Sequence, residues 1–225
     1  MGNLDSSAIG QFILHMVALV FSLSVHESAH AWTSNRFGDD LARSQGRISL
    51  NPSVHVDPIG TLLFPAIAFF TGAPLIGWAK PTPVNPLRWR NKRVANFWVS
   101  IAGVISNFMI AIVAGVAIRV LYSFDVIGRS SLNESALAKG AVELLFVFFT
   151  LNVALGVFNL LPIPPLDGSK VLGSILGPSF DSGLEALERF GFILLFIAVF
   201  TGVLGVVFRV VMPIAWGLVF IGTNR

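Results

Sequence analysis

The chain has 225 residues, of which 54% are hydrophobic and only 12% carry a charged side chain, and its mean hydropathy is +0.78. A soluble domain carries about 25% charged residues, so this composition excludes a water-soluble globule and indicates a polytopic membrane protein. The absence of cysteine excludes disulfides and thiolate metal sites. The net charge of +3 is scattered along the chain, so no nucleic-acid partner is expected.

Five apolar stretches follow one another along the chain and set the expected architecture. They cover residues 8–33, 59–79, 94–121, 141–163 and 190–221. A helix needs about 20 residues to cross a bilayer, so we expect an all-α polytopic integral membrane protein with about four to six transmembrane or re-entrant helices. The last stretch would be about 48 Å long as one helix, which exceeds the hydrocarbon core. It should break near Gly202 or Gly205, or end in an interfacial piece.

The first stretch contains two histidines at helical spacing, in the run HESAH at residues 26–30. Residues four apart on a helix lie on one face, about 6 Å apart in rise, so His26 and His30 present their imidazoles to one metal ion. Glu27 lies beside them in the position of a general base. A chance occurrence of the pattern is the alternative. It is disfavoured because ionisable groups inside a span are costly unless they serve a site.

A catalytic zinc site uses three protein ligands, so a third must come from another part of the chain. The fourth apolar stretch ends in NLLPIPPLDG at residues 159–168, where three prolines in four residues prevent the helix from continuing. The chain should unwind there and present Asp167, the candidate third ligand, with Gly168 permitting a tight turn. The alternative is that Asp167 caps a helix that begins at Ser169.

The two motifs together resemble the site-2 protease family of intramembrane zinc metalloproteases, in its minimal form without a PDZ insertion. Shorter matching pieces lie at residues 46–52, 55–60, 78–81, 83–86 and 102–107. The resemblance implies one Zn²⁺ per chain, with His26, His30 and Asp167 as ligands and Glu27 as general base. It also implies substrates that are single-span membrane proteins in the lipid bilayer. Val104 departs from the family pattern, which often has proline there, so a kink in the third stretch is in question.

The ligand assignment also predicts the topology. His26 lies about 27 Å along the first helix, and Asp167 lies at the exit end of the fourth stretch. Both reach one ion only if the two helices run parallel, so the proline-containing stretch 59–79 should re-enter the membrane rather than cross it. Residues 80–93 hold five basic side chains and no acid, which places them in the cytoplasm. The expected location is a bacterial cell membrane, with the zinc site toward the cytoplasmic side.

Other polar residues have two interpretations each. Asn107 and Asn159 could bind a substrate carbonyl, as the resemblance suggests, or join helices by hydrogen bonds. His55 either approaches the site or is a solvated loop histidine. His15 is too far along the first helix to reach the same metal and is interpreted as an interhelical hydrogen bonder.

Residues 47–50 alternate between polar and apolar side chains, as a strand does. The run consists of Arg47, Ile48, Ser49 and Leu50. An edge strand in a short hairpin-like loop near the zinc could capture an unwound substrate by strand addition. The alternative is a surface hairpin that does not contact the substrate.

The expected function is an intramembrane zinc metalloendopeptidase that cleaves peptide bonds within or next to transmembrane segments, as in regulated intramembrane proteolysis. The expected organisation is a single membrane-embedded domain over 1–225, with a catalytic core at about 8–170 and a C-terminal helical segment at 188–222. One alternative is a membrane metal-ion transporter, which would not need Glu27. Another is a non-catalytic homologue that binds membrane partners. The donor set also suits iron or cobalt.

Overall fold

The computed structural model of the chain describes residues 6–72, 77–127 and 135–222, and over these ranges all regular structure is helical. Four of the described helices are long and apolar enough to cross a membrane: α1 (Ser6–Arg36), α4 (Lys92–Ser123), α6 (Ala136–Leu160) and α10 (Val203–Phe220). The predicted all-α polytopic membrane fold is therefore confirmed.

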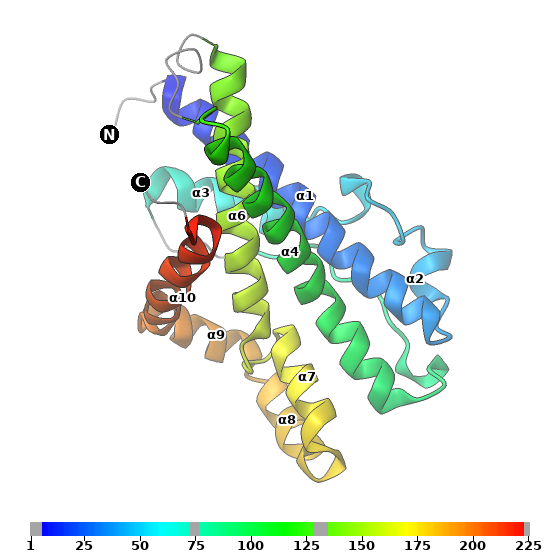
Figure 1. Cartoon of the computed structure of the whole chain (residues 1–225). Helices are drawn as coiled ribbons and strands as arrows, with labels where there is room; N and C mark the ends of the chain where they lie inside the picture. The colour runs from blue at the N-terminus through cyan, green and yellow to red at the C-terminus, as the bar shows by residue number, and fades with distance from the viewer. Residues whose placement is uncertain (1–5, 73–76, 128–134, 223–225) are drawn as a thin grey trace.

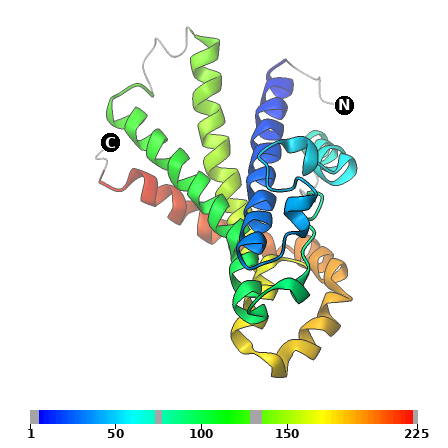
Figure 2. The same cartoon turned by 90° about the vertical axis from the view of Figure 1, so that its right-hand side faces the viewer.

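Helices α1, α4 and α6 form the bundle that carries the candidate site. Helix α4 packs against both α1 and α6 and runs in the opposite direction to each of them (Figure 1, Figure 2). Helices α1 and α6 consequently run parallel, as the ligand argument requires. Helix α10 completes an apolar core with the C-terminal half of α4 and with α6. This core is built around Ala111, Ala114, Ile118, Phe149, Val153 and Val219.

The apolar stretch after α1 is too short to cross the membrane. It forms a π-helix, η2 (Pro58–Leu63), which continues into α3 (Phe64–Thr71). Together they would be only about 20 Å long, against a hydrocarbon core of about 30 Å. Helix α3 packs on the N-terminal half of α1, where the Phe12 ring lies 5.4 Å from that of Phe69 and 4.9 Å from that of Phe70.

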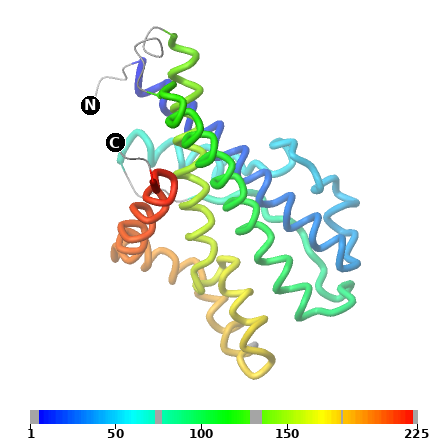
Figure 3. The backbone as a smooth tube through the Cα atoms, viewed as in Figure 1, coloured from blue at the N-terminus to red at the C-terminus, as the bar shows by residue number. Residues whose placement is uncertain are grey.

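After this helical part, residues 77–80 lie beside residues 55–60 (Figure 3). The Trp78 N–H donates to the Gly60 carbonyl at 3.1 Å, and the Lys80 N–H donates to the His55 carbonyl at 2.8 Å. We call residues 58–82 the return segment. Its two arms lie side by side, and a re-entrant course for residues 59–79 stays a prediction.

The loops before and after the return segment meet beyond the C-terminal end of α1. These loops contain the short helices α2 (Leu41–Ser44), η1 (Pro52–Val54) and η3 (Pro86–Arg88). The Asn85 N–H donates to the Asp39 carboxylate at 2.7 Å, the Arg90 N–H donates to the Phe37 carbonyl at 3.1 Å, and Arg88 pairs with Asp40. Both loops therefore lie on the same side of the bundle.

After α6, the chain folds into several shorter helices before its last span. These are α7 (Asp167–Leu176), η4 (Pro178–Phe180), α8 (Asp181–Glu188) and α9 (Gly191–Phe200). The last apolar stretch breaks at Gly202, whose φ of 78° lies in the left-handed region that favours glycine. The predicted break near this residue is confirmed, and it allows α10 to turn back onto α4 and α6.

Candidate metal centre

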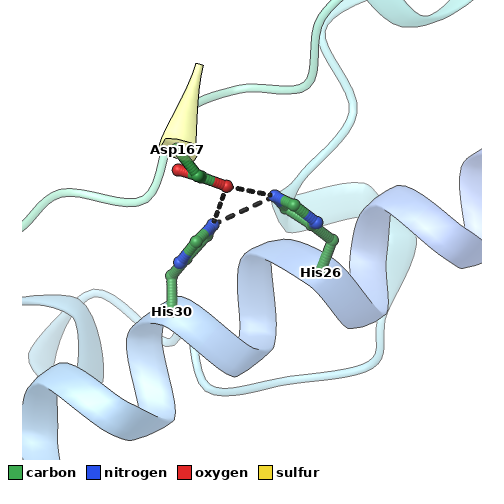
Figure 4. Close-up of side chains that lie close together, drawn as sticks. All are labelled: His26, His30 and Asp167. Carbon is green, nitrogen blue, oxygen red and sulfur yellow. Dashed lines mark hydrogen bonds and ion pairs between the residues drawn. The ribbon is translucent and has the colours of Figure 1, made fainter. Parts of the chain in front are cut away.

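Two histidines of α1 and one aspartate of α7 converge at a single point (Figure 4). The Nε2 atoms of His26 and His30 lie 3.0 Å apart. The Oδ2 atom of Asp167 lies 3.1 Å from Nε2 of His26 and 3.2 Å from Nε2 of His30. All three residues are buried. The structure thus brings together the three residues that the sequence assigns as metal ligands.

Asp167 reaches this point because α6 ends at Leu160 and the proline-containing segment 161–166 does not continue it. Helix α7 begins at Asp167 itself, its N-cap is Leu166, and no side chain caps it. The alternative in which Asp167 caps a helix from Ser169 is therefore wrong. A Cβ on Gly168 would lie 2.2 Å from the Leu160 carbonyl oxygen, so only glycine allows the start of α7 to pack this closely against the end of α6.

The hydrogen bonds behind the two imidazoles fix their tautomers. Nδ1 of His26 lies 2.6 Å from Oδ1 of Asn107, and Nδ1 of His30 lies 2.6 Å from the Val99 carbonyl oxygen. Carbonyl oxygens only accept hydrogen bonds, so each Nδ1 carries the proton. In the neutral ring, Nε2 is then the nitrogen that keeps its lone pair, and it faces the other ligand atoms.

The three convergent atoms are suited to a zinc ion. The two Nε2 atoms face a buried carboxylate oxygen, Oδ2 of Asp167, which has no partner other than these two nitrogens. When the rings are neutral, three electron-rich atoms this close repel one another unless a cation lies between them. Ligand atoms about 2.0–2.1 Å from a tetrahedral zinc ion would be about 3.3 Å apart, close to the separations seen here.

Gly103 of α4 lies against the Nε2 edges of the two imidazoles. A Cβ at this position would be 2.5 Å from Cε1 of His26 and 2.6 Å from Nε2 of both histidines. We call His26, His30 and Asp167 the metal group. The close approach of α4 to the metal group depends on the absence of a side chain at Gly103. The neighbouring Val104, where the family pattern often has proline, is buried, and α4 continues through it as one helix from Lys92 to Ser123.

Glu27 is positioned by the returning arm of the return segment. Its Oε2 accepts a hydrogen bond from the Thr82 N–H at 2.8 Å, and the Thr82 hydroxyl donates to the Glu27 carbonyl at 2.9 Å. Thr82 could not be singled out from the sequence, because its N–H is a backbone donor and its hydroxyl binds a backbone carbonyl.

Residues 47–50 do not form a strand, so both the edge-strand and the hairpin interpretations are wrong. Arg47 is instead buried, and its Nη2 donates to the carbonyl oxygens of Lys80 and Pro81. Burial lowers the pKa of Arg47, and the charge of Glu27 opposes this shift. Arg47 thus holds the arm that carries Thr82. Ile48 and Ser49 are half-buried and Leu50 is exposed.

His55 is not the solvated loop residue of the second interpretation, because only 1% of it is exposed. Its Nε2 donates to the Ser49 carbonyl at 2.8 Å. Burial lowers the pKa of His55, so the imidazole is neutral near pH 7.

The two asparagines with open interpretations, Asn107 and Asn159, have different surroundings. Asn107 is fully buried between His26 and Asn152. Asn159 instead donates to the Leu155 carbonyl of its own helix at 3.0 Å. His15 bonds the Gln11 carbonyl within α1 rather than a second helix, which corrects its expected interhelical role. Asn152, which the sequence did not single out, is one of the polar residues behind the metal group.

Comparisons with known proteins find similarity along most of the chain. The chain matches the model of peptidase family M50 over residues 14–198. It is 36% identical to the putative zinc metalloprotease YwhC of Bacillus subtilis, over 84% of this chain and 81% of that protein. It is 30% identical to the putative zinc metalloprotease Rip2 of Mycolicibacterium smegmatis, over 87% of this chain and 70% of that protein. The protein of the same name from Mycobacterium tuberculosis is 31% identical, over 84% and 67%. No solved structure matches the chain.

Proposed function

Since the chain belongs to peptidase family M50, the site-2 protease family, and is a zinc-dependent peptidase, we propose that it cleaves peptide bonds within or next to transmembrane segments of single-span membrane proteins. The observation that supports this proposal is the position of the metal group. His26 and His30 belong to a helix long and apolar enough to cross a membrane, and Asp167 follows another such helix after the short segment 161–166. A peptide bond that meets this group must come from a membrane segment or from its immediate flank.

The ligand and base roles follow from the contacts. His26, His30 and Asp167 would hold the ion, and the bound zinc would supply a Lewis acid that polarises water and the scissile carbonyl. Glu27 would take a proton from the attacking water and return it to the leaving amine. Thr82 would keep the Glu27 carboxylate turned toward the site through its bond to Oε2.

The substrate must be unwound before cleavage, because a helix shields its own peptide groups. The chain around the site is irregular at residues 47–50, 77–85 and 161–166, and such backbone is tolerated at membrane depth where it lines a cavity. Substrate contact by residues 47–50 and by Asn159 stays a prediction.

We place the protein in a bacterial cell membrane with the metal group toward the cytoplasm. The support is the charge of one of the two loops at this end of the bundle. The loop at residues 80–93 carries five basic residues and no acid, and positive loops remain on the cytoplasmic side.

The first test is Glu27→Gln, which preserves the shape of the side chain and an acceptor for the Thr82 N–H but removes the base. Zinc content should persist, while cleavage of single-span substrates in liposomes falls by about 10²-fold or more. Glu143→Gln is the matched control, because Glu143 is a partly exposed acid of α6 paired with Lys139. Near-normal cleavage by Glu27→Gln would contradict the mechanism. Metal flux through vesicles that survives this change would instead favour a transporter.

The second test is Asp167→Asn, which removes one anionic oxygen with little change in shape. Zinc should be lost or strongly weakened, because the charge of a ligand is worth far more beside a dication in a low-dielectric site than in water. Zinc per chain is measured after matched purification, with monodispersity in detergent as the folding control. Asp40→Asn, in an exposed pair with Arg88, should bind normal zinc. Normal zinc in Asp167→Asn would remove Asp167 from the ligand set.

A further inference from the structure

We propose that Asn107 and Asn152 are positioning residues that hold His26 in the tautomer and orientation that a zinc ligand requires, and that Asn107 is not a substrate-binding group. The inference rests on the ligand set proposed above. It concerns a buried line of hydrogen bonds that connects a backbone carbonyl of α6 to Nδ1 of His26, the ring nitrogen that faces away from the other two ligands.

The line starts at Phe148, whose backbone carbonyl fixes the Asn152 amide. Nδ2 of Asn152 donates to the Phe148 carbonyl at 2.9 Å and to the Ser22 hydroxyl oxygen at 2.8 Å. A carbonyl oxygen cannot donate, so the Asn152 amide cannot flip without losing this bond. Its Oδ1 must therefore face α4.

Asn107 passes this orientation on to His26. Nδ2 of Asn107 donates to Oδ1 of Asn152 at 2.8 Å, so Oδ1 of Asn107 is directed at Nδ1 of His26, 2.6 Å away. Nδ1 must then carry the proton, and Nε2 is left with the lone pair that a metal needs. A carbonyl on α6 thereby determines where a proton is held on α1.

Burial makes these side chains difficult to replace by water. Ser22, Asn107 and Asn152 are fully buried, and 5% of His26 is exposed. A fully buried amide also cannot reach a substrate in this structure, which argues against a substrate-binding role for Asn107. A buried polar chain of this kind holds one arrangement when every member has its partner.

His30 provides an internal comparison. Its Nδ1 bonds directly to the Val99 carbonyl of α4 at 2.6 Å, so its tautomer is fixed without any amide side chain. Changes in the amide line should therefore disturb His26 and leave His30 in place. Because the line joins α1, α4 and α6, the affinity for zinc also depends on the packing of α6.

The experiment compares four variants of the full-length protein by zinc affinity, measured in competition with a chromophoric chelator. Asn107→Leu and Asn152→Leu should weaken zinc binding by about 10- to 100-fold, the usual effect of losing an outer partner of a metal ligand. Asn107→Asp should stay within a few-fold of wild type, because one carboxyl oxygen still accepts from Nδ1 of His26 and the other, as a protonated acid, can still donate to Oδ1 of Asn152. Ser22→Ala should also stay close to wild type, because the Phe148 carbonyl still holds Asn152.

A cobalt-loaded sample gives a second readout. The visible spectrum of bound Co²⁺ should change in Asn107→Leu and remain close to wild type in Asn107→Asp. A substrate-binding role predicts the opposite pattern. Zinc affinity and the cobalt spectrum would be normal in all variants, KM would rise for both Asn107 variants, and Asn152→Leu would have no effect. If Asn152→Leu does not fold, the two Asn107 variants still decide the question.

Wild-type zinc affinity in Asn107→Leu would overturn this proposal. It would leave the ligand set intact, provided that His26→Ala binds zinc weakly in the same assay. Wild-type affinity in His26→Ala would show instead that the ligand set itself is wrong.

Discussion

Gly103 shows how closely the metal group is packed at the level of a single residue. In a regular helix, alanine is more stable than glycine by about 1 kcal/mol, so glycine in the middle of α4 is unfavourable for the helix alone. A Cβ would lie 2.5 Å from a carbon of the His26 ring and 2.6 Å from Nε2 of both histidines. The missing side chain leaves the space that the imidazoles occupy.

Gly103→Ala should therefore lower zinc content although it favours the helix. The methyl group must displace one or both imidazoles, and the three ligand atoms then no longer converge. We expect most of the zinc to be lost with helicity unchanged by circular dichroism. Gly140→Ala is the control, because a Cβ at Gly140 meets no atom within 4 Å, and it should bind normal zinc. Full zinc in Gly103→Ala would show that the imidazoles can move aside.

For single residues, the sequence pointed to the candidate ligands and missed the residues that support them. His26 and His30 follow from helical spacing with Glu27 beside them, whereas the prolines that end α6 left two interpretations of Asp167, and its ligand role came from the family resemblance. Asn152 could not be predicted, because an amide in an apolar helix gives no indication of which helix it faces. Asn107 was noted but its partner was not, since a contact across 81 positions depends on the packing of the helices.

Among the elements, the return segment connects membrane packing to the catalytic base. Gly60 and Gly77 let its two arms approach: a Cβ on Gly60 would lie 2.5 Å from the Trp78 ring, and a Cβ on Gly77 would lie 2.6 Å from the Gly60 carbonyl oxygen. The Thr61 hydroxyl donates to the Trp78 carbonyl at 2.8 Å. Farther along the same arm, Thr82 bonds to Glu27.

Gly60→Ala should separate the two arms and reduce activity without removing zinc. Overpacking of this kind typically costs about 1–3 kcal/mol, and the shift displaces the arm that carries Thr82. We expect a lower melting temperature, normal zinc per chain and slower cleavage. Gly205→Ala, where a Cβ meets no atom within 4 Å, should resemble wild type in all three measurements. Unchanged cleavage by Gly60→Ala would mean that the return segment does not position Glu27.

Prolines and glycines predicted the elements more reliably than short alternating patterns did. The limited length of η2 and α3 agrees with the breakers inside residues 59–79, and Gly202 separates α9 from α10. The alternation at residues 47–50 failed because four residues cannot distinguish a strand from an irregular segment. There the Arg47 guanidinium binds two backbone carbonyls of the return segment, an interaction that hydrophobic periodicity does not encode.

For the whole molecule, two independent features give the same topology. The metal group requires α1 and α6 to run parallel, which the structure has (Figure 1, Figure 2). The contacts of Asp39 with Asn85 and of Phe37 with Arg90 place the loops on either side of the return segment at one end of the bundle. The start of α6 lies at the other end. The charge of residues 80–93 supports the proposal that the end carrying the metal group faces the cytoplasm.

Single-cysteine labelling tests this assignment, because the native chain has no cysteine. Three exposed positions are suitable: Ser53 before the return segment, Leu87 after it, and Leu137 at the start of α6. In sealed right-side-out vesicles, an impermeant maleimide should label Leu137→Cys but not Ser53→Cys or Leu87→Cys. In inside-out vesicles the pattern should reverse. Labelling of Ser53→Cys and Leu87→Cys from opposite sides would mean that the return segment crosses the membrane. Labelling of both from the outside would keep the fold but invert its orientation. Normal zinc content in each variant confirms that the labelled protein retains the metal group.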